Sequence, residues 1–161
     1  MNNVVEVVAQ VLDAFSKVHK PLRIMSSSAS LEGQQVAAFF KSLRWQDVSL
    51  ALLRAKYIGD ISACLEFLDG PSGLYFLPAY LTISVESYWE ADMLPITLER
   101  QLAENPVLSN NFMSLAPTLS IEQAGAVASA LHFIRGYYES NQQQSGADKA
   151  LQNYWSTFLT G

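Results

Sequence analysis

Three carboxylates near the middle of the chain are the residues whose types and spacing come closest to catalytic chemistry. Glu86 and Glu90 stand four residues apart, so on a helix they would share one face, and Asp92 follows shortly after. Paired carboxylates can share a proton or hold a divalent cation. A cation site would need more ligands, and a general acid would need a pocket. We therefore interpret these residues as a solvated or partner-facing acidic edge.

The other reactive side chains form no catalytic constellation. His19 and His132 are the only histidines, and neither belongs to a His-Glu-x-x-His or Cys/His ligand pattern. Cys64, the only cysteine, lies among apolar neighbours, which favours a small buried residue over a reactive thiol and excludes an intrachain disulfide. The sequence contains no glycine-rich phosphate loop and no Gly-x-Ser-x-Gly elbow. We predict no enzyme activity, no bound metal and no cofactor.

The length and composition fit one folded domain. The chain has 161 residues, of which 50% are apolar and 16% are charged. No apolar run reaches the roughly 18 residues that a membrane-spanning helix needs, so we expect no membrane partner. The first 15 residues have no Lys or Arg ahead of their apolar run, which Glu6 interrupts. We therefore expect a mature N-terminus rather than a signal peptide, and a cytoplasmic protein.

The apolar residues recur mostly at helical spacing. In the first segment one stripe contains Val4, Val8, Val11, Phe15 and Val18, widened by Val5 and Leu12. This pattern predicts a helix of about four turns that ends before Pro21. Further helices are predicted at about residues 31–43, 49–57, 60–68, 92–104, 120–138 and 145–159. Because no segment alternates like a strand, the sequence predicts an all-α fold: one domain over residues 1–161, a bundle of roughly six to eight helices.

Several predicted helix ends carry capping signals. Ser120 with Gln123, and Ser145 with Asp148, have the spacing of capping boxes. Asp92 is expected to cap the helix that has a proline in its first turn. The polar residues 141–146 are interpreted as a linker to the last helix.

The stretch LYFLPAYLTISVESYW, which starts at Leu74, concentrates aromatic residues around Pro78. A proline inside a helix lacks an N–H and its ring clashes with the carbonyl four residues earlier. We therefore predict one or two helical turns, then a kink or restart at Pro78, in a central helix that runs to about Glu90. Tyr80 and Tyr88 are expected at the margin of the core, where a tyrosine can also serve a binding surface.

The net charge of −5 divides unevenly along the chain. Residues 1–56 hold seven basic and four acidic residues, a net charge of +3, whereas residues 57–161 hold three basic and eleven acidic residues, a net charge of −8. The stretch from Asp60 to Glu104 contains eight acidic residues and one basic residue, Arg100. Such a field repels nucleic acid and attracts basic partners. Ordinary solvated helix faces are the alternative interpretation.

Four motifs together resemble a family of small uncharacterised bacterial proteins. They are "DAFSKVHKP", Glu32 before "VAAFFKSLRWQDV", "LYFLPAYL" and "LSIEQAGAVASAL". The match covers about residues 9–138 and leaves residues 141–161 unaligned, and the Tyr-Phe-Leu-Pro-Ala-Tyr part is the specific one. Some proteins that look like this are immunity proteins, which neutralise a toxin delivered by contact-dependent or type VI secretion. The signature residues that the resemblance implies are Trp45, Tyr75, Phe76, Leu77, Pro78 and Tyr80, which we interpret as packing residues.

The leading functional hypothesis is a non-enzymatic immunity protein whose partner is a cognate toxin with a basic surface, such as a nuclease. Acidic residues would steer the encounter, and aromatic residues would anchor it. A self-associating structural or adaptor module, with exposed aromatics at a homo-oligomer interface, is one alternative. A small enzyme that uses the carboxylates of 86–92 is another. The predicted partner-binding residues are Tyr80, Glu86, Tyr88, Trp89, Glu90, Asp92 and Glu99.

Overall fold

The computed structural model describes residues 2–138 and 145–160, and in these residues the chain is helical. Its α-helices are α1 (Val4–Ala14), α2 (Leu31–Phe40), α3 (Leu50–Lys56), α4 (Cys64–Phe67), α5 (Gly70–Glu86), α6 (Leu94–Leu102), α7 (Ile121–Arg135) and α8 (Gly146–Asn153). The 3-10 helices are η1 (Trp45–Asp47), η2 (Phe112–Thr118) and η3 (Trp155–Phe158). In the described part of the chain, β-structure is limited to an isolated bridge between Ser26 and Leu68. The all-α prediction is confirmed.

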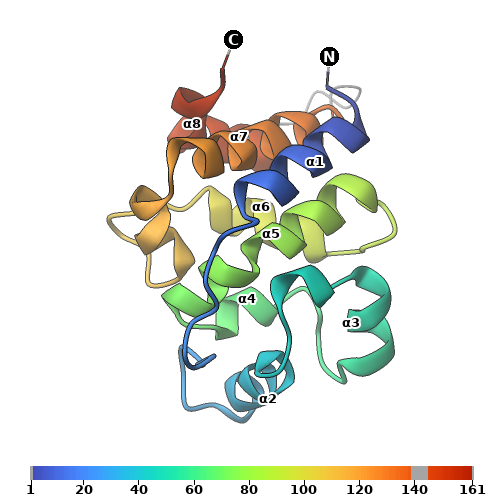
Figure 1. Cartoon of the computed structure of the whole chain (residues 1–161), viewed down its shortest axis with the longest axis vertical. Helices are drawn as coiled ribbons and strands as arrows, with labels where there is room; N and C mark the ends of the chain where they lie inside the picture. Colours follow the sequence, from blue (N-terminus) through green and yellow to red (C-terminus); the bar gives the residue numbers. More distant parts are fainter. Residues whose placement is uncertain (1, 139–144, 161) are drawn as a thin grey trace.

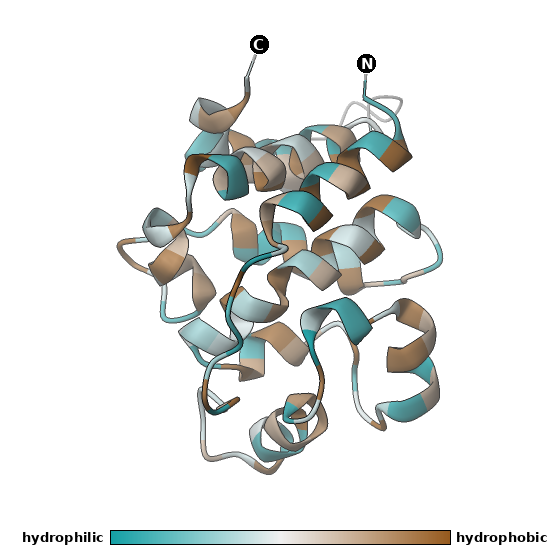
Figure 2. Ribbon diagram, viewed as in Figure 1, coloured by the Kyte–Doolittle hydropathy of each residue, from teal (hydrophilic) through white to brown (hydrophobic). Residues whose placement is uncertain are grey.

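Helix α5 crosses the middle of the molecule, and the other helices pack around it (Figure 1). Helices α1, α7 and α8 lie together at the end where both termini emerge, and α2 and α3 lie at the opposite end. Helix α1 packs on both α7 and α5, and α6 bridges α5 and α8. Helices α1, α6 and α8 each have a hydrophilic and a hydrophobic side, as expected for helices that surround one core, and Figure 2 shows both kinds of residue along α1.

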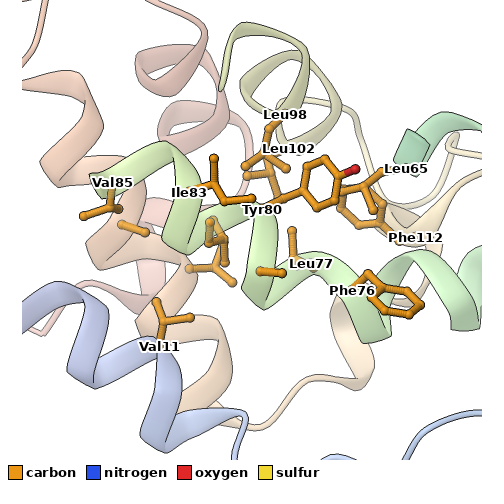
Figure 3. Close-up of a cluster of buried hydrophobic side chains, with 14 of the residues drawn as sticks. Val11, Leu65, Phe76, Leu77, Tyr80, Ile83, Val85, Leu98, Leu102 and Phe112 are labelled. Carbon is orange, nitrogen blue, oxygen red and sulfur yellow. The ribbon is translucent and has the colours of Figure 1, made fainter. Parts of the chain in front are cut away.

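Buried residues lie on every side of α5, which explains the aromatic stretch around Pro78. Phe76, Leu77 and Tyr80 point into a cluster that also receives side chains from α1, α6 and η2 (Figure 3). A helix that is apolar all round must be covered all round to be stable in water. All six residues of the implied signature are buried, including Trp45, whose backbone N–H donates to the Tyr75 hydroxyl at 3.4 Å.

Helix α5 continues through Pro78, so of the two predicted alternatives, a kink or a restart, the restart is wrong. Asp69 caps the helix by accepting from the Ser72 N–H at 2.9 Å, and Pro71 lies in the first turn. Beyond the proline, the Thr82 hydroxyl donates to the Pro78 carbonyl at 2.9 Å. A long buried segment can absorb the lost backbone hydrogen bond because tertiary packing holds both halves in place.

The outer helices are shorter than the periodicity predicts. Helix α1 ends at Ala14, and its buried face is centred on Val7 and Val11, whereas Val5 and Leu12 are exposed. In a valine-rich segment, several faces have similar hydropathy, so the periodicity does not select the one that is buried. Helix α5 ends at Glu86 rather than near residue 90.

The capping signals identify the helix starts well. Both capping boxes, Ser120 with Gln123 and Ser145 with Asp148, are present. Asp92 does not cap α6: Met93 occupies that position, with no side-chain cap. The sequence also missed η2, and it merged α8 with η3 into one helix. Of the predicted linker, residues 141–144 lie outside the described residues, whereas Ser145 and Gly146 belong to the start of α8.

Candidate partner-binding surface

The turn that joins α5 to α6 carries most of the predicted contact residues. We call residues 86–93 the acidic-aromatic segment. Its carboxylates Glu86, Glu90 and Asp92 are exposed, and the Trp89 side chain is 62% exposed between them. Met93 adds a second exposed apolar side chain at the end of the segment. The structure therefore brings four of the seven predicted residues together on one exposed turn.

The other three predicted residues lie inside the fold. Tyr80 is 1% exposed, Tyr88 is 4% exposed and Glu99 is 1% exposed, so none of them can touch a partner in this conformation. Tyr80 donates from its hydroxyl to the Ile61 carbonyl at 3.3 Å within the core. Glu99 was expected at the surface because a charged residue is exposed by default. The start of α8 covers it instead: a Cβ added at Gly146 would lie 2.8 Å from the Glu99 Cβ.

An aromatic platform supports Trp89 from below. The Tyr88 ring stacks on the Tyr137 ring, with ring centres 4.9 Å apart and an angle of 21° between the planes. The Trp89 indole meets Tyr88 edge-on at 5.0 Å and also contacts Tyr137 and Tyr138. The Tyr137 hydroxyl donates to the Val85 carbonyl at 2.9 Å, which links the residues just after α7 to the end of α5. The platform restricts the indole's freedom before any partner binds.

Beneath this platform lies a small buried polar cluster. The Tyr88 hydroxyl donates to a Glu99 carboxylate oxygen at 3.4 Å and also shares a hydrogen bond with the Tyr138 hydroxyl. Burial, with a smaller contribution from the negative charge of Asp148, raises the pKa of Glu99 from 4.5 to about 7. The Asp148 carboxylate is itself paired with Arg135, at 3.7 Å. The acidic-aromatic segment is thus coupled to a carboxyl group that titrates near neutral pH.

Arg54 from α3 holds the outer edge of the acidic-aromatic segment. Its guanidinium lies 3.5 Å from the Asp92 carboxylate and donates to the Glu90 backbone carbonyl. Both side chains of the ion pair are substantially exposed, so the pair adds little stability. Asp92 has a φ of 51°, the left-handed region that few non-glycine residues adopt. Arg54 and this backbone turn leave the Glu90 side chain free to face solvent.

Nearly the whole chain matches one protein family. A family model described as "Family of unknown function (DUF6714)" matches residues 3–159. The chain belongs to this family. The match extends to residue 159 and so includes most of the segment 141–161, which the sequence motifs left unaligned. No curated protein and no solved structure shows a significant match to this DUF6714 chain.

Two open hollows stand out on the described part of the DUF6714 chain. One, of about 420 Å³, lies between the end of α1, the start of α5, η2 and the start of α7, and is lined mainly by apolar side chains with Lys17 and His19 at its edge. The other, of about 590 Å³, lies between residues 20–25 and the outer face of α2. We call this second hollow the cationic groove.

The reactive side chains stay apart in the described residues of this DUF6714 protein. Within residues 2–138 and 145–160, no three His, Cys, Asp or Glu side chains converge in a way that could hold a metal ion. Cys64 is buried, as predicted, and burial raises the pKa of its thiol to about 11. A thiol with such a pKa is protonated at neutral pH and is a poor nucleophile. No helix of the described part of the chain is long and apolar enough to cross a bilayer.

Sequence reasoning missed the residues that position the acidic-aromatic segment. Arg54 precedes Asp92 by 38 positions, and no local pattern connects the two residues. Tyr137 and Tyr138 lie just past the end of α7. The sequence shows two pairs of adjacent aromatic residues, Tyr88 with Trp89 and Tyr137 with Tyr138. That these pairs contact each other can be inferred only once α5 and α7 are known to be neighbours.

Proposed function

We propose that this DUF6714 protein is a non-enzymatic immunity protein. It binds a secreted bacterial toxin that acts in the cytosol and neutralises the toxin by covering its active site. The observation that supports this proposal is the acidic-aromatic segment: an exposed indole, Trp89, on a rigid platform, with the exposed carboxylates Glu86, Glu90 and Asp92 around it.

This arrangement suits protein recognition because each part meets a different need. Tryptophan is among the residues that most often contribute the largest share of binding free energy when they enter a partner's pocket. The platform of Tyr88 and Tyr137 lowers the entropy lost on binding, since the indole is already held. The carboxylates raise the association rate with a positively charged partner and disfavour acidic ones.

The chemistry of the segment defines the kind of toxin surface it fits. Exposed carboxylates on the same turn as an exposed indole complement a cluster of Lys and Arg beside an apolar or aromatic recess. A nuclease presents such a surface where it holds the phosphate backbone of its substrate. In this mechanism the immunity protein occupies the substrate-binding surface and carries out no reaction itself.

The test is an affinity pull-down from the native bacterium with the tagged protein as bait. Two variants remove the two parts of the surface: Glu86→Lys/Glu90→Lys reverses its charge, and Trp89→Ala removes its anchor. Asp13→Lys/Glu32→Lys is the matched control, because it makes the same charge change on other exposed residues. We expect one stoichiometric basic partner that the wild type and the control retain and that both surface variants lose.

A second measurement tests neutralisation rather than binding. The captured partner is expressed in a heterologous host with the wild-type protein or with Glu86→Lys/Glu90→Lys. We expect the partner alone to arrest growth, the wild type to restore it and the variant to fail. Capture that survives in both surface variants, or a partner that is harmless on its own, would contradict the proposal.

A further inference from the structure

The cationic groove lies at the opposite end of the molecule from the bundle of α1, α7 and α8. Three cations line it: Lys20 and Arg23 from the segment before α2, and Lys41 at the end of α2. The Lys20 ammonium donates to the Lys41 carbonyl at 2.8 Å, so it bridges the two walls. The other lining residues are all apolar: Pro21, Leu22, Ile24, Met25, Ala37 and Ala38.

The positive charge of the groove is not neutralised within the fold. In the described part of the chain, none of its three cations takes part in an ion pair. Lys20 acts electrostatically on Asp47, but Asp47 is already paired with Arg44 at 3.1 Å. The groove therefore presents positive potential on a protein whose net charge is −5.

The apolar residues of the groove also lack cover. Leu22 is fully exposed and Met25 is about half exposed, and both stand at the rim beside the cations. An apolar recess rimmed by charge is typical of a surface that receives a partner's side chain. Its volume of about 590 Å³ is large enough to admit one aromatic side chain with part of its flanking backbone.

The acidic-aromatic segment of a second copy has the complementary chemistry. It offers one exposed indole, Trp89, with exposed carboxylates at Glu86, Glu90 and Asp92, whereas the groove is lined by apolar side chains and three cations. We propose that the acidic-aromatic segment of one copy docks in the cationic groove of another. Trp89 enters the recess beside Arg23, and the carboxylates of the first copy pair with the cations of the second.

The positions of the two surfaces make this contact head-to-tail. Figure 1 shows residues 20–25 and α2 at the lower end of the molecule, and the turn between α5 and α6 at the side above α3. A single copy cannot bring them together without unfolding. A pair of copies uses one groove and one segment and keeps one of each free, so association continues into open chains or closed rings. The contact forms without a toxin. It also covers the acidic-aromatic segment, which is the proposed toxin-binding surface.

The first experiment measures the mass of the purified protein by light scattering from about 5 μM to about 500 μM in about 50 mM salt. We expect the average mass to rise with concentration, and to fall toward the monomer in about 0.5 M salt, where charges are screened within roughly 4 Å. Glu86→Lys/Glu90→Lys and Arg23→Glu/Lys41→Glu should each weaken association at least about tenfold. Lys56→Glu/Lys149→Glu, which changes charges elsewhere, should not.

Mixing the two reversed variants gives the decisive result. In Glu86→Lys/Glu90→Lys the acidic-aromatic segment has become basic, so it fits the acidic groove of Arg23→Glu/Lys41→Glu. The unchanged groove of Glu86→Lys/Glu90→Lys still accepts the native segment of Arg23→Glu/Lys41→Glu. Neither variant should associate alone, and the mixture should. Thermal unfolding of each variant verifies that it folds. A wild type that stays monomeric at all concentrations, or a mixture that stays monomeric, overturns the proposal.

The outcomes also separate this contact from the toxin proposal. Self-association is measured on the purified protein alone, whereas neutralisation needs the captured partner. Arg23→Glu/Lys41→Glu changes only the groove, so this variant should lose self-association and should still bind the toxin. If that variant still self-associates but no longer binds the toxin, the groove binds the toxin rather than a second copy, and the head-to-tail contact is wrong.

Discussion

Glu99 shows how one residue connects the stability of the fold to its surface. Its carboxyl group lies under the start of α8 and beside the Tyr88 hydroxyl, where water cannot solvate a negative charge. The pKa of about 7 follows from that burial. Above pH 7 the folded protein must hold a poorly solvated carboxylate directly beneath the platform that carries Trp89.

We predict that Glu99→Gln makes the protein more stable at pH 8 and changes little at pH 4.5. The folded-state pKa of Glu99 is raised from 4.5 to about 7, so the folded protein binds this proton more tightly than the unfolded chain. The stabilisation is therefore full below pH 4.5 and is lost as the pH rises to 7. Glutamine stays neutral and keeps an acceptor for Tyr88. The gain at pH 8 is at most about 3 kcal/mol.

Urea unfolding at pH 4.5, 6 and 8 measures this difference. Other titrating groups are common to both proteins, so they cancel when the two free energies of unfolding are subtracted. Glu86→Gln, at an exposed position on the same segment, is the matched control and should show no such trend. A difference between Glu99→Gln and the wild type that is constant with pH would show that Glu99 is not buried in a charged form.

At the scale of elements, the sequence predicted where helices begin but not which face of a helix is buried. Serine caps specify where α7 and α8 begin because the capping hydrogen bonds are local to a few residues. The buried face of α1 depends on which valines meet α5 and α7, which is tertiary information. For the same reason, the sequence identified the exposed carboxylates of the candidate surface but placed Tyr88 and Glu99 on it, although neighbouring helices cover both.

Two helical glycines should respond in opposite directions to the same substitution. A Cβ at Gly146 would lie 2.8 Å from the Glu99 Cβ, so Gly146→Ala forces α8 away from α6 and should destabilise by about 1–3 kcal/mol. A Cβ at Gly125, inside α7, would meet its nearest neighbour, the Phe158 carbonyl, at 3.5 Å. Gly125→Ala should therefore stabilise by up to about 1 kcal/mol. Thermal unfolding compares the two, and equal shifts would contradict this packing.

At the scale of the whole molecule, opposite charges occupy different places on the surface. The sequence revealed this split, with a net charge of +3 before residue 57 and −8 after it. It did not reveal that the basic part forms a groove, because the groove needs residues 20–25 folded back against α2. A charge count predicts the sign of a partner, and only the fold shows where each partner can sit.

The three tryptophans report on this surface. Trp45 is 2% exposed and Trp155 is fully buried, whereas Trp89 is exposed. We predict that acrylamide quenches wild-type fluorescence in low salt at about 5 μM protein mainly through Trp89, and that Trp89→Phe lowers the quenching constant several-fold. At about 500 μM, the wild type should resemble that variant because the indole is docked in a second copy. If the average mass rises with protein concentration but the quenching constant does not change, Trp89 lies outside the contact between copies.

The burial of Cys64 makes the molecule convenient for site-specific labelling. Its thiol is shielded and protonated at neutral pH, so maleimide dyes should leave the native chain unmodified. A cysteine introduced at Lys56 or Lys149, both exposed positions, would be the single reactive thiol. Donor and acceptor dyes on separate copies could then report the spacing between successive molecules by energy transfer, with no background from the rest of the chain.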